Sequence, residues 1–182
     1  ALPYFYALSP NYGDYENDYQ DQYLSGTLTL ESKLIYEALL REGPLHTLDL
    51  RRAANLTAST STGRFNKALD DLQVQLKVLP VGVAQAGAWH YAFIYDILPR
   101  HFPQIEAQAG PIQENEARAY LLDVYFRAVG AASAPQAARL LGWPILLTLS
   151  LIQASVAAGR LLADITLPDE SKPLFAHPEV LP

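Results

Sequence analysis

The chain has 182 residues, of which 50% are hydrophobic and 18% are charged, with 10 Gly, 13 Pro and no Cys or Met. This composition excludes a collagenous or wholly disordered chain and predicts a globular protein of one large or two small domains. The lack of Cys excludes a disulfide framework, a thiolate metal site and a cysteine nucleophile, and it favours a reducing, cytoplasmic setting. The four His residues lie far apart in the sequence, so we expect no metal and no cofactor.

The net charge of −6 is distributed unevenly along the chain. Residues 1–28 contain four acidic residues and no Lys or Arg, whereas residues 47–77 contain five basic residues against three aspartates. A nucleic-acid footprint is a local feature of a surface, so the overall acidity does not exclude one. Residues 47–77 form the only basic island and are therefore the only expected footprint.

Residues 1–28 interleave tyrosine with Asp, Asn and Gln and show neither a helical nor a strand period. Six of the eleven tyrosines fall in this stretch. We interpret it as an ordered connecting arm that lays tyrosine rings on a neighbouring surface. It has no basic region followed by an apolar run, so it does not read as a signal peptide.

Residues 29–97 carry the pattern of a first domain. Thr29 can cap a helix that Gly43-Pro44 ends, Thr47 can cap a short second helix, and apolar residues from Phe65 to Leu76 recur every three or four positions in a third. Residues 77–83 and 88–95 are rich in β-branched and aromatic residues and predict a hairpin, with Trp89, Tyr91 and Phe93 as core and His90 outside. Three helices closed by a two-stranded hairpin predict a winged helix.

The same plan recurs after a linker at residues 98–112. Aligning Gly43 with Gly130 gives a constant offset of 87, with Ser133 as a helix cap and Pro144 at the start of the next helix. Residues 160–163 and 165–167 can supply a reduced wing, so residues 113–182 predict a second winged-helix domain with a C-terminal tail. The predicted fold class is therefore mainly α with small β-hairpin wings, an α+β chain of tandem winged-helix (helix-turn-helix) domains.

Residues 140–159 carry no charge. The helix in the recognition position of the second domain therefore offers no cation to phosphates. The stretch just reaches the length of a membrane span, but Pro144, Gly142 and several polar residues interrupt it, so we expect no membrane insertion. We expect it instead to be buried by its own domain, by a protein partner or by a second copy in a homodimer, through Leu140 to Gly159.

In a winged helix the third helix lies in the major groove of double-stranded DNA, while the turn before it and the wing contact the backbone. The basic island predicts that cationic side chains hold phosphates and that short hydroxyl side chains add hydrogen bonds. The alternative is that these are ordinary solubilising residues, since Asp70 and Asp71 on the same helix would repel phosphate. The candidate nucleic-acid-binding residues are Arg51, Arg52, Ser59, Thr60, Ser61, Arg64, Lys67 and Lys77.

The chain lacks the common catalytic motifs. It has no G-x-S-x-G, no H-E-x-x-H and no phosphate-cradling Gly-rich loop. Motifs therefore support no enzyme class.

Several strings resemble a known family: LPYFYALSPNYGDYENDYQDQY, SKLIYEALLREGPLHTLDLRRAANL, RFNKALDDLQVQLKVLPVGVAQAGAWHYAFIYDILPRHFP and QAARLLGWP. They are similar to uncharacterised bacterial proteins grouped with the winged-helix, crosslink-repair DNA glycosylases of the YcaQ or AlkZ type. Proteins of that branch look longer at the front. With the missing methionine, this leads us to expect a third domain upstream of Ala1.

The resemblance implies tandem winged helices and, in the active glycosylases, a Gln-apolar-Asp or Gln-apolar-Gln motif that positions a water on the glycosidic carbon. The residues Gln73-Val74-Gln75 match the residue types of this motif. Because it falls at the end of the third helix, we interpret it as ordinary helix-end polar residues. The favoured hypothesis is a non-catalytic, DNA-binding protein of a repair-related branch; a glycosylase excising alkylated or crosslinked bases and a protein-interaction scaffold are the alternatives.

Overall fold

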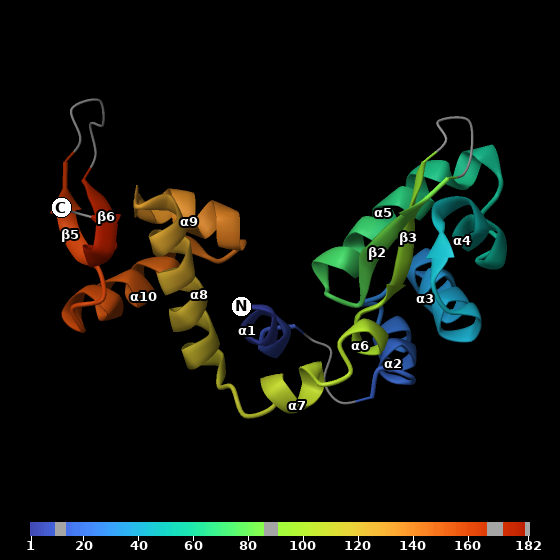
Figure 1. Cartoon of the computed structure of the whole chain (residues 1–182), viewed down its shortest axis with the longest axis horizontal. Coiled ribbons are helices and arrows are strands. Elements are labelled where there is room, and N and C mark those ends of the chain that lie inside the picture. Colours follow the sequence, from blue (N-terminus) through green and yellow to red (C-terminus); the bar gives the residue numbers. More distant parts are fainter. Residues whose placement is uncertain (10–13, 86–90, 167–172, 181–182) are drawn as a thin grey trace. The chain divides into compact units, whose positions relative to one another are not determined.

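The computed structural model describes residues 1–9, 14–85, 91–166 and 173–180 (Figure 1). The chain divides into two compact units. The N-terminal unit is Ser9–Ala109, and the C-terminal unit is Gly110–Pro182 together with Ala1–Leu8. Each unit combines helices with a three-stranded antiparallel sheet, which confirms the predicted α+β class.

The predicted helices of the N-terminal unit form, and local capping explains their ends. Helix α3 begins because Thr29 Oγ1 accepts a hydrogen bond from the backbone N–H of Ser32 at 3.1 Å. It ends at Gly43, whose φ of +86° favours a residue without a Cβ. The helical elements are α2 (Asp18–Leu24), α3 (Leu30–Glu42), α4 (Thr47–Ala53), the 3₁₀ turn η1 (Ser59–Ser61), α5 (Thr62–Val74), α6 (Leu98–His101) and α7 (Ile105–Ala109).

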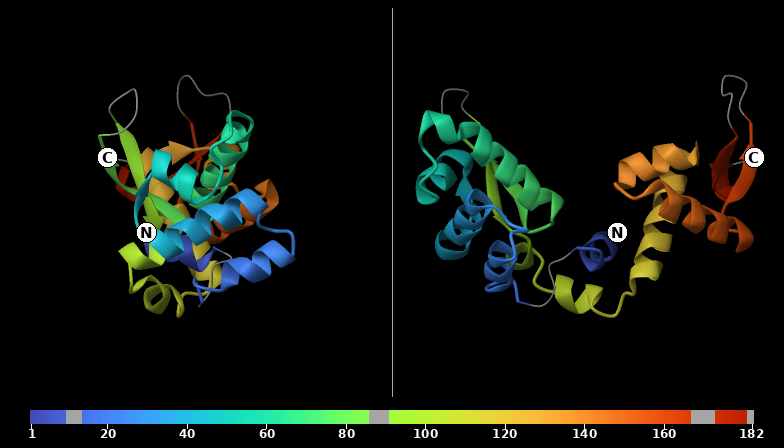
Figure 2. Two further views of the ribbon diagram at one scale, coloured as in Figure 1. Left: turned by 90° about the vertical axis from the view of Figure 1, so that its right-hand side faces the viewer. Right: turned by 180° about the vertical axis from the view of Figure 1, so that it is seen from behind.

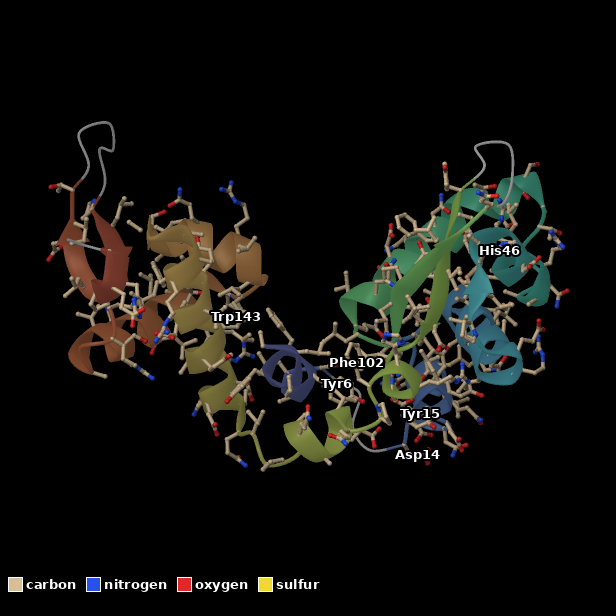
Figure 3. All side chains as sticks on the ribbon, viewed as in Figure 1. Tyr6, Asp14, Tyr15, His46, Phe102 and Trp143 are labelled. Atoms are coloured by element: carbon tan, nitrogen blue, oxygen red, sulfur yellow. The ribbon has the colours of Figure 1, made fainter. Side chains whose placement is uncertain are left out.

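The cap of helix α4 differs from the prediction. Its N-cap is His46, whose Nδ1 accepts from the backbone N–H of Asp49 at 3.4 Å (Figure 3). Thr47, predicted as the cap, is the first helical residue, and its hydroxyl instead donates to the carbonyl of Phe93 at 3.3 Å. The start of α4 is therefore attached to the sheet.

The sheet of this unit has the strand order β1-β3-β2, with β1 (Leu45–His46), β2 (Val78–Ala84) and β3 (Ala92–Ile97). Strands β2 and β3 form the predicted hairpin, but its outer part is not core. Tyr91 is 69% exposed, and Phe93 and its cross-strand partner Val83 are 56% and 58% exposed. The expectation that Tyr91 and Phe93 are buried is wrong, because only the inner end of this face, at Tyr95 and Ile97, reaches the helices. Trp89 and His90 lie outside the described residues.

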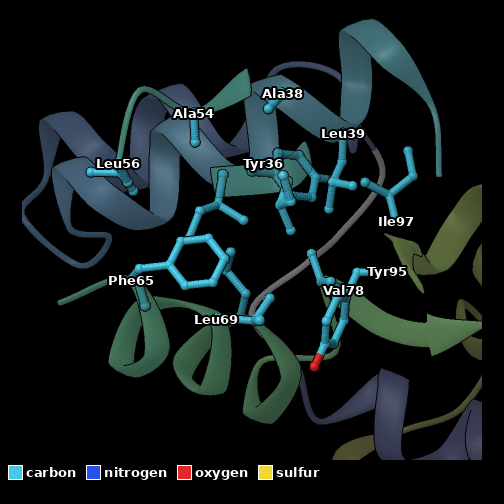
Figure 4. Packing of buried hydrophobic residues seen from close by; sticks show 14 of the residues in the cluster. Tyr36, Ala38, Leu39, Ala54, Leu56, Phe65, Leu69, Val78, Tyr95 and Ile97 are labelled. Carbon is cyan, nitrogen blue, oxygen red and sulfur yellow. The ribbon is translucent and has the colours of Figure 1, made fainter. Parts of the chain in front are cut away.

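The core of the N-terminal unit joins α3, α4 and α5 to the inner end of the hairpin (Figures 1, 2 and 4). Phe65 and Leu69 from α5 face residues of α3, while Val78, Tyr95 and Ile97 close the cluster from the sheet (Figure 4). The apolar faces of these three helices therefore pack against one pair of strands. This packing fixes the position of α5 and leaves its opposite face to solvent.

The C-terminal unit has the sheet order β4-β6-β5. Ser133 caps α9 as predicted, within a capping box that Gln136 completes, and Pro144 directly precedes α10. The reduced wing differs from the prediction, because Leu162–Ile165 form one strand, β5, that pairs with β6 further along the chain. Leu167 lies outside the described residues. The elements are α1 (Leu2–Ala7), α8 (Glu114–Val129), β4 (Ala131–Ala132), α9 (Ala134–Leu141), α10 (Ile145–Ala157), β5 (Leu162–Ile165), β6 (Leu174–Ala176) and the 3₁₀ turn η2 (Pro178–Val180).

The two units share one element order. The series α3-β1-α4-α5-β2-β3 corresponds to α8-β4-α9-α10-β5-β6, and both first helices end at a glycine with positive φ, Gly43 and Gly130. The offset of 87 relates Thr47 and Ala134, the first residues of α4 and α9, but not the next pair of helices. The reason is the linker: residues 54–61 separate α4 from α5, whereas only residues 142–144 separate α9 from α10.

The first 28 residues are helical in part, contrary to the prediction. Helix α1 lies in the C-terminal unit and α2 in the N-terminal unit. The tyrosine rings do pack on helices: Tyr4 stacks on Tyr120 of α8, and Tyr19 packs against Tyr36 of α3. Short helices held by such contacts show no sequence period of their own.

Helix α10 is only partly buried by its own unit. Thr148, Ile152 and Ser155 face the interior, whereas Leu146 is 78% exposed and Leu140, at the end of α9, is 70% exposed. Within the described ranges no single helix is long and apolar enough to cross a membrane. The pair α9 and α10 passes on length and composition together but is bent by 118°.

Candidate nucleic-acid interface

The eight candidate residues fall on α4, η1, the first turns of α5 and the position directly before β2 in the N-terminal unit. The structure separates them into surface side chains and side chains that hold the unit together. Arg52, Ser59, Thr60, Arg64 and Lys67 are exposed. The other three are engaged inside the unit.

Arg51 stabilises the turn between α4 and α5. Its guanidinium donates to the carbonyls of Leu56 and Ala58 at 3.2 and 3.4 Å and to Thr62 Oγ1 at 3.0 Å. Its Cζ also lies 5.5 Å from the centre of the Phe65 ring, a cation-π distance. Because its donors already have acceptors on both sides of the turn, Arg51 positions α5 instead of presenting a free charge.

Ser61 has the same structural role. It is 3% exposed, and its Oγ lies 2.8 Å from the carbonyl oxygen of Leu56 and 2.6 Å from that of Ala58. The hydroxyl therefore donates within the same turn whose carbonyls also accept from Arg51. Of the predicted hydroxyl run, Ser59 and Thr60 are the exposed members.

Each of the three exposed cations has a carboxylate neighbour. Arg52 pairs with Asp49 at 3.1 Å, Arg64 with Glu31 at 3.0 Å and Lys67 with Asp71 at 3.0 Å. The cationic side chains remain 67%, 65% and 75% exposed, respectively. Exposed pairs of this kind contribute only about 0–1 kcal/mol. A phosphate can therefore replace the carboxylate at small cost.

Lys77 is not part of this surface. The residue is 2% exposed, its Nζ lies 2.8 Å from Asp18 Oδ2, and the Tyr36 ring centre lies 5.2 Å away. Burial lowers the pKa of the Lys77 ammonium below its usual 10.5, and the hydrogen bond with Asp18 opposes this shift. The prediction that places Lys77 among exposed phosphate ligands is at odds with this burial.

The outer hairpin adds apolar residues that the sequence prediction assigned to the core. Phe93 and Val83 lie directly opposite each other, and Tyr91, two residues before Phe93 and just ahead of β3, is also exposed. The side of β3 that carries Phe93 also carries Tyr95, whose pKa is raised by burial and by the charge of Asp70 on α5. The exposed hairpin face therefore continues past the surface of α5. The sequence prediction missed that strands β2 and β3 extend beyond the helices that cover them.

The Gln73-Val74-Gln75 motif lies at the C-terminal end of α5. The side-chain amide of Gln73 donates to the carbonyl of Leu69 in its own helix at 3.2 Å. Gln75 is the C-cap residue, and its carbonyl accepts from Ser9 Oγ at 2.9 Å. Val74 between them is 83% exposed. These contacts place the motif at a helix end, as interpreted from the sequence.

The structure thus defines a two-unit α+β protein in which one unit exposes hydroxyl and cationic side chains at the start of one helix. A family model described as AlkZ related matches residues 1–142, so the chain belongs to the AlkZ-related family. This membership indicates a DNA-repair-related protein. No curated protein and no solved structure matches the chain.

Proposed function

We propose that the chain is a tandem winged-helix protein that binds double-stranded DNA through its N-terminal unit, without catalysing base excision itself. The order helix, strand, helix, helix, strand, strand supports the winged-helix assignment of both units. In this arrangement α4 and α5 form the helix-turn-helix, α5 is the recognition helix and β2-β3 is the wing.

The observation that carries this proposal is the start of α5. Arg64 and Lys67 project from its first turns into solvent, next to the exposed hydroxyls of Ser59 and Thr60. Arg52 on α4 adds a third exposed cation. Phosphate recognition needs such cations and short hydroxyls around a helix that enters the groove. Arg51 and Ser61 contribute indirectly, by fixing the turn that presents α5.

The C-terminal unit has a different role in this proposal. Helix α10, which occupies the position of α5, contains no charged residue. It offers phosphates no ion pair, so DNA affinity resides in the N-terminal unit.

The test is fluorescence anisotropy with a labelled duplex of about 20 base pairs at several salt concentrations. Each phosphate contact contributes roughly 0.9 to the slope of log K against log salt. The double variant Arg64→Ala/Lys67→Ala should therefore weaken binding and reduce the slope by about two. Arg139→Ala, which removes an exposed cation of α9, is the matched control and should leave both unchanged. Binding that ignores salt, or no binding at low salt, would refute the proposal.

Family membership also favours a second candidate, excision of alkylated or crosslinked bases with Gln73 and Gln75 orienting water. This candidate predicts abasic sites in alkylated DNA that Gln75→Ala abolishes. The Gln73 contact to its own helix counts against it. Product formation by the wild type and its loss in Gln75→Ala would replace the non-catalytic proposal.

A further inference from the structure

The C-terminal unit contains a pocket that the DNA-binding proposal does not use. Its volume is about 520 Å³, within the usual range for small-molecule sites. One face of α8 lines it, together with α1, the turn after α10 and the C-terminal turn. The pocket therefore brings together four segments of one unit that are distant in sequence.

An aromatic platform lies in this pocket. The rings of Tyr4 and Tyr120 stack with their centres 3.8 Å apart and their planes 11° apart. Tyr120 is 37% exposed and lines the pocket, so part of its ring is open to a ligand. A planar heteroaromatic ring such as a nucleobase stacks on such a surface, and the stacking depends little on which base it is.

A network of charged groups is fixed at the other side of the pocket. The Asp123 carboxylate lies 2.9 Å from Arg127 Nε and 3.3 Å from His177 Nε2. His177 is 5% exposed, and its Nδ1 accepts the backbone N–H of Glu179 at 3.2 Å. Glu179 Oε2 in turn lies 3.8 Å from Arg127 Nη1. These contacts link α8 to the C-terminal turn and hold the turn in place.

Two charges in the pocket stand outside this network. Among the described residues, neither Arg160 nor Glu116 has an ion-pair partner, and both line the cavity. A guanidinium binds phosphate through parallel N–H donors. A carboxylate accepts hydrogen bonds from an amino group. The pocket thus offers a cation, an anion and an aromatic surface within one small volume.

We propose that this pocket binds a nucleoside monophosphate whose base carries an exocyclic amino group. The base stacks on Tyr120, its amino group donates to Glu116, and the phosphate pairs with Arg160. The site shares no residue with the DNA surface of the N-terminal unit, so the inference does not depend on that proposal.

The probe is AMP, titrated into the ¹⁵N-labelled full chain and followed by heteronuclear NMR. We expect saturable shifts for residues of the pocket. Adenosine, which lacks the phosphate, ribose 5-phosphate, which lacks the base, and UMP, which lacks the amino group, should each bind at least fivefold more weakly. A 5′-phosphorylated deoxyadenosine trinucleotide separates the two sources of this chemistry. If the trinucleotide binds as tightly as AMP, the pocket is a site for the ends of nucleic-acid strands. If the trinucleotide binds more weakly, the pocket is a site for free nucleotides.

Variants provide the decisive comparison. Arg160→Ala and Tyr120→Leu should each weaken AMP binding at least fivefold, whereas Arg139→Ala, outside the pocket, should not. The dispersion of the amide spectrum shows whether each variant remains folded. The variant Arg64→Ala/Lys67→Ala should bind AMP normally, which separates failure of this inference from failure of DNA binding. The inference is overturned if AMP gives no saturable shifts, if AMP and UMP bind equally, or if Arg160→Ala has no effect.

Discussion

The ammonium of Lys77, directly before β2, lies 2.8 Å from the Asp18 carboxylate of α2, fifty-nine residues earlier in the chain. The Lys77 side chain is 1% exposed and that of Asp18 is 13% exposed. Two opposite charges are thus buried together where α2 meets the end of α5. The pair attaches the Tyr-rich N-terminal segment to the rest of the N-terminal unit.

Replacing one member of this pair should destabilise the protein strongly. In Asp18→Asn the shape is retained, but the buried ammonium loses its counter-charge, which typically costs about 3–5 kcal/mol. Urea unfolding measures the change. The matched control is Asp71→Asn, which breaks the exposed pair with Lys67 and should cost less than about 1 kcal/mol. Equal losses in the two variants would contradict a buried, energetically coupled pair.

The same burial predicts a pH dependence. Because the pKa of Lys77 is lowered in the folded state, the unfolded chain binds more protons between that lowered pKa and 10.5. Stability contributed by this site therefore rises as the pH increases through that window, by at most about 1.4 kcal/mol per pH unit for one proton. Below the window both states are protonated and the contribution is constant.

The measurement is the difference in unfolding free energy between the wild type and Lys77→Met from pH 7 to 10.5. The pKa values of Tyr95 and Tyr125 are also raised, chiefly by burial, but both residues are present in the two proteins and their effects cancel in the difference. The unfolding free energy of the wild type should increase relative to that of Lys77→Met as the pH increases. A difference that is flat, or that moves the other way, would contradict the lowered pKa.

Local patterns in the sequence predicted the elements that depend on neighbouring residues. The Thr29 cap, the Gly43 end of α3 and the Ser133 cap each involve residues within a few positions of one another. Such contacts form in any context, so the sequence alone specifies them.

Contacts between distant residues were not predictable in the same way. Nothing near Lys77 in sequence indicates that Asp18 covers it, and the pattern around Phe93 cannot show that the strands extend beyond the helices. The strand β6 was missed because its partner β5 is separated from it by residues 166–173. The pocket of the C-terminal unit was missed for the same reason, since it combines Tyr4 with residues of α8 and of the C-terminal turn.

Arg51 should affect stability far more than its neighbour Arg52. In Arg51→Lys the ammonium cannot bridge Leu56 and Thr62 as the guanidinium does, so the hydrogen bonds that join the two sides of the turn are lost. We expect a loss of about 1–3 kcal/mol in urea unfolding. Arg52→Lys keeps an exposed charge beside Asp49 and should change stability by less than about 0.5 kcal/mol. Similar values for both would show that the Arg51 contacts contribute little.

The exposed face of the hairpin should contribute to DNA binding and not to stability. Phe93 is 56% exposed, so Phe93→Ser removes an aromatic ring from the surface at a cost below about 1 kcal/mol, most of it from the lost pair with Val83. Apolar side chains of this kind insert at the minor groove in many DNA complexes. We expect the Kd for a duplex to rise roughly fivefold, equivalent to about 1 kcal/mol, in the same anisotropy assay. Leu24→Ser is the control, because Leu24 is 80% exposed on α2 of the same unit and away from the proposed interface. If Phe93→Ser binds DNA like the wild type, or if Leu24→Ser weakens binding equally, the hairpin face is not part of the interface. In that case the phosphate contacts at α4 and α5 account for the whole affinity.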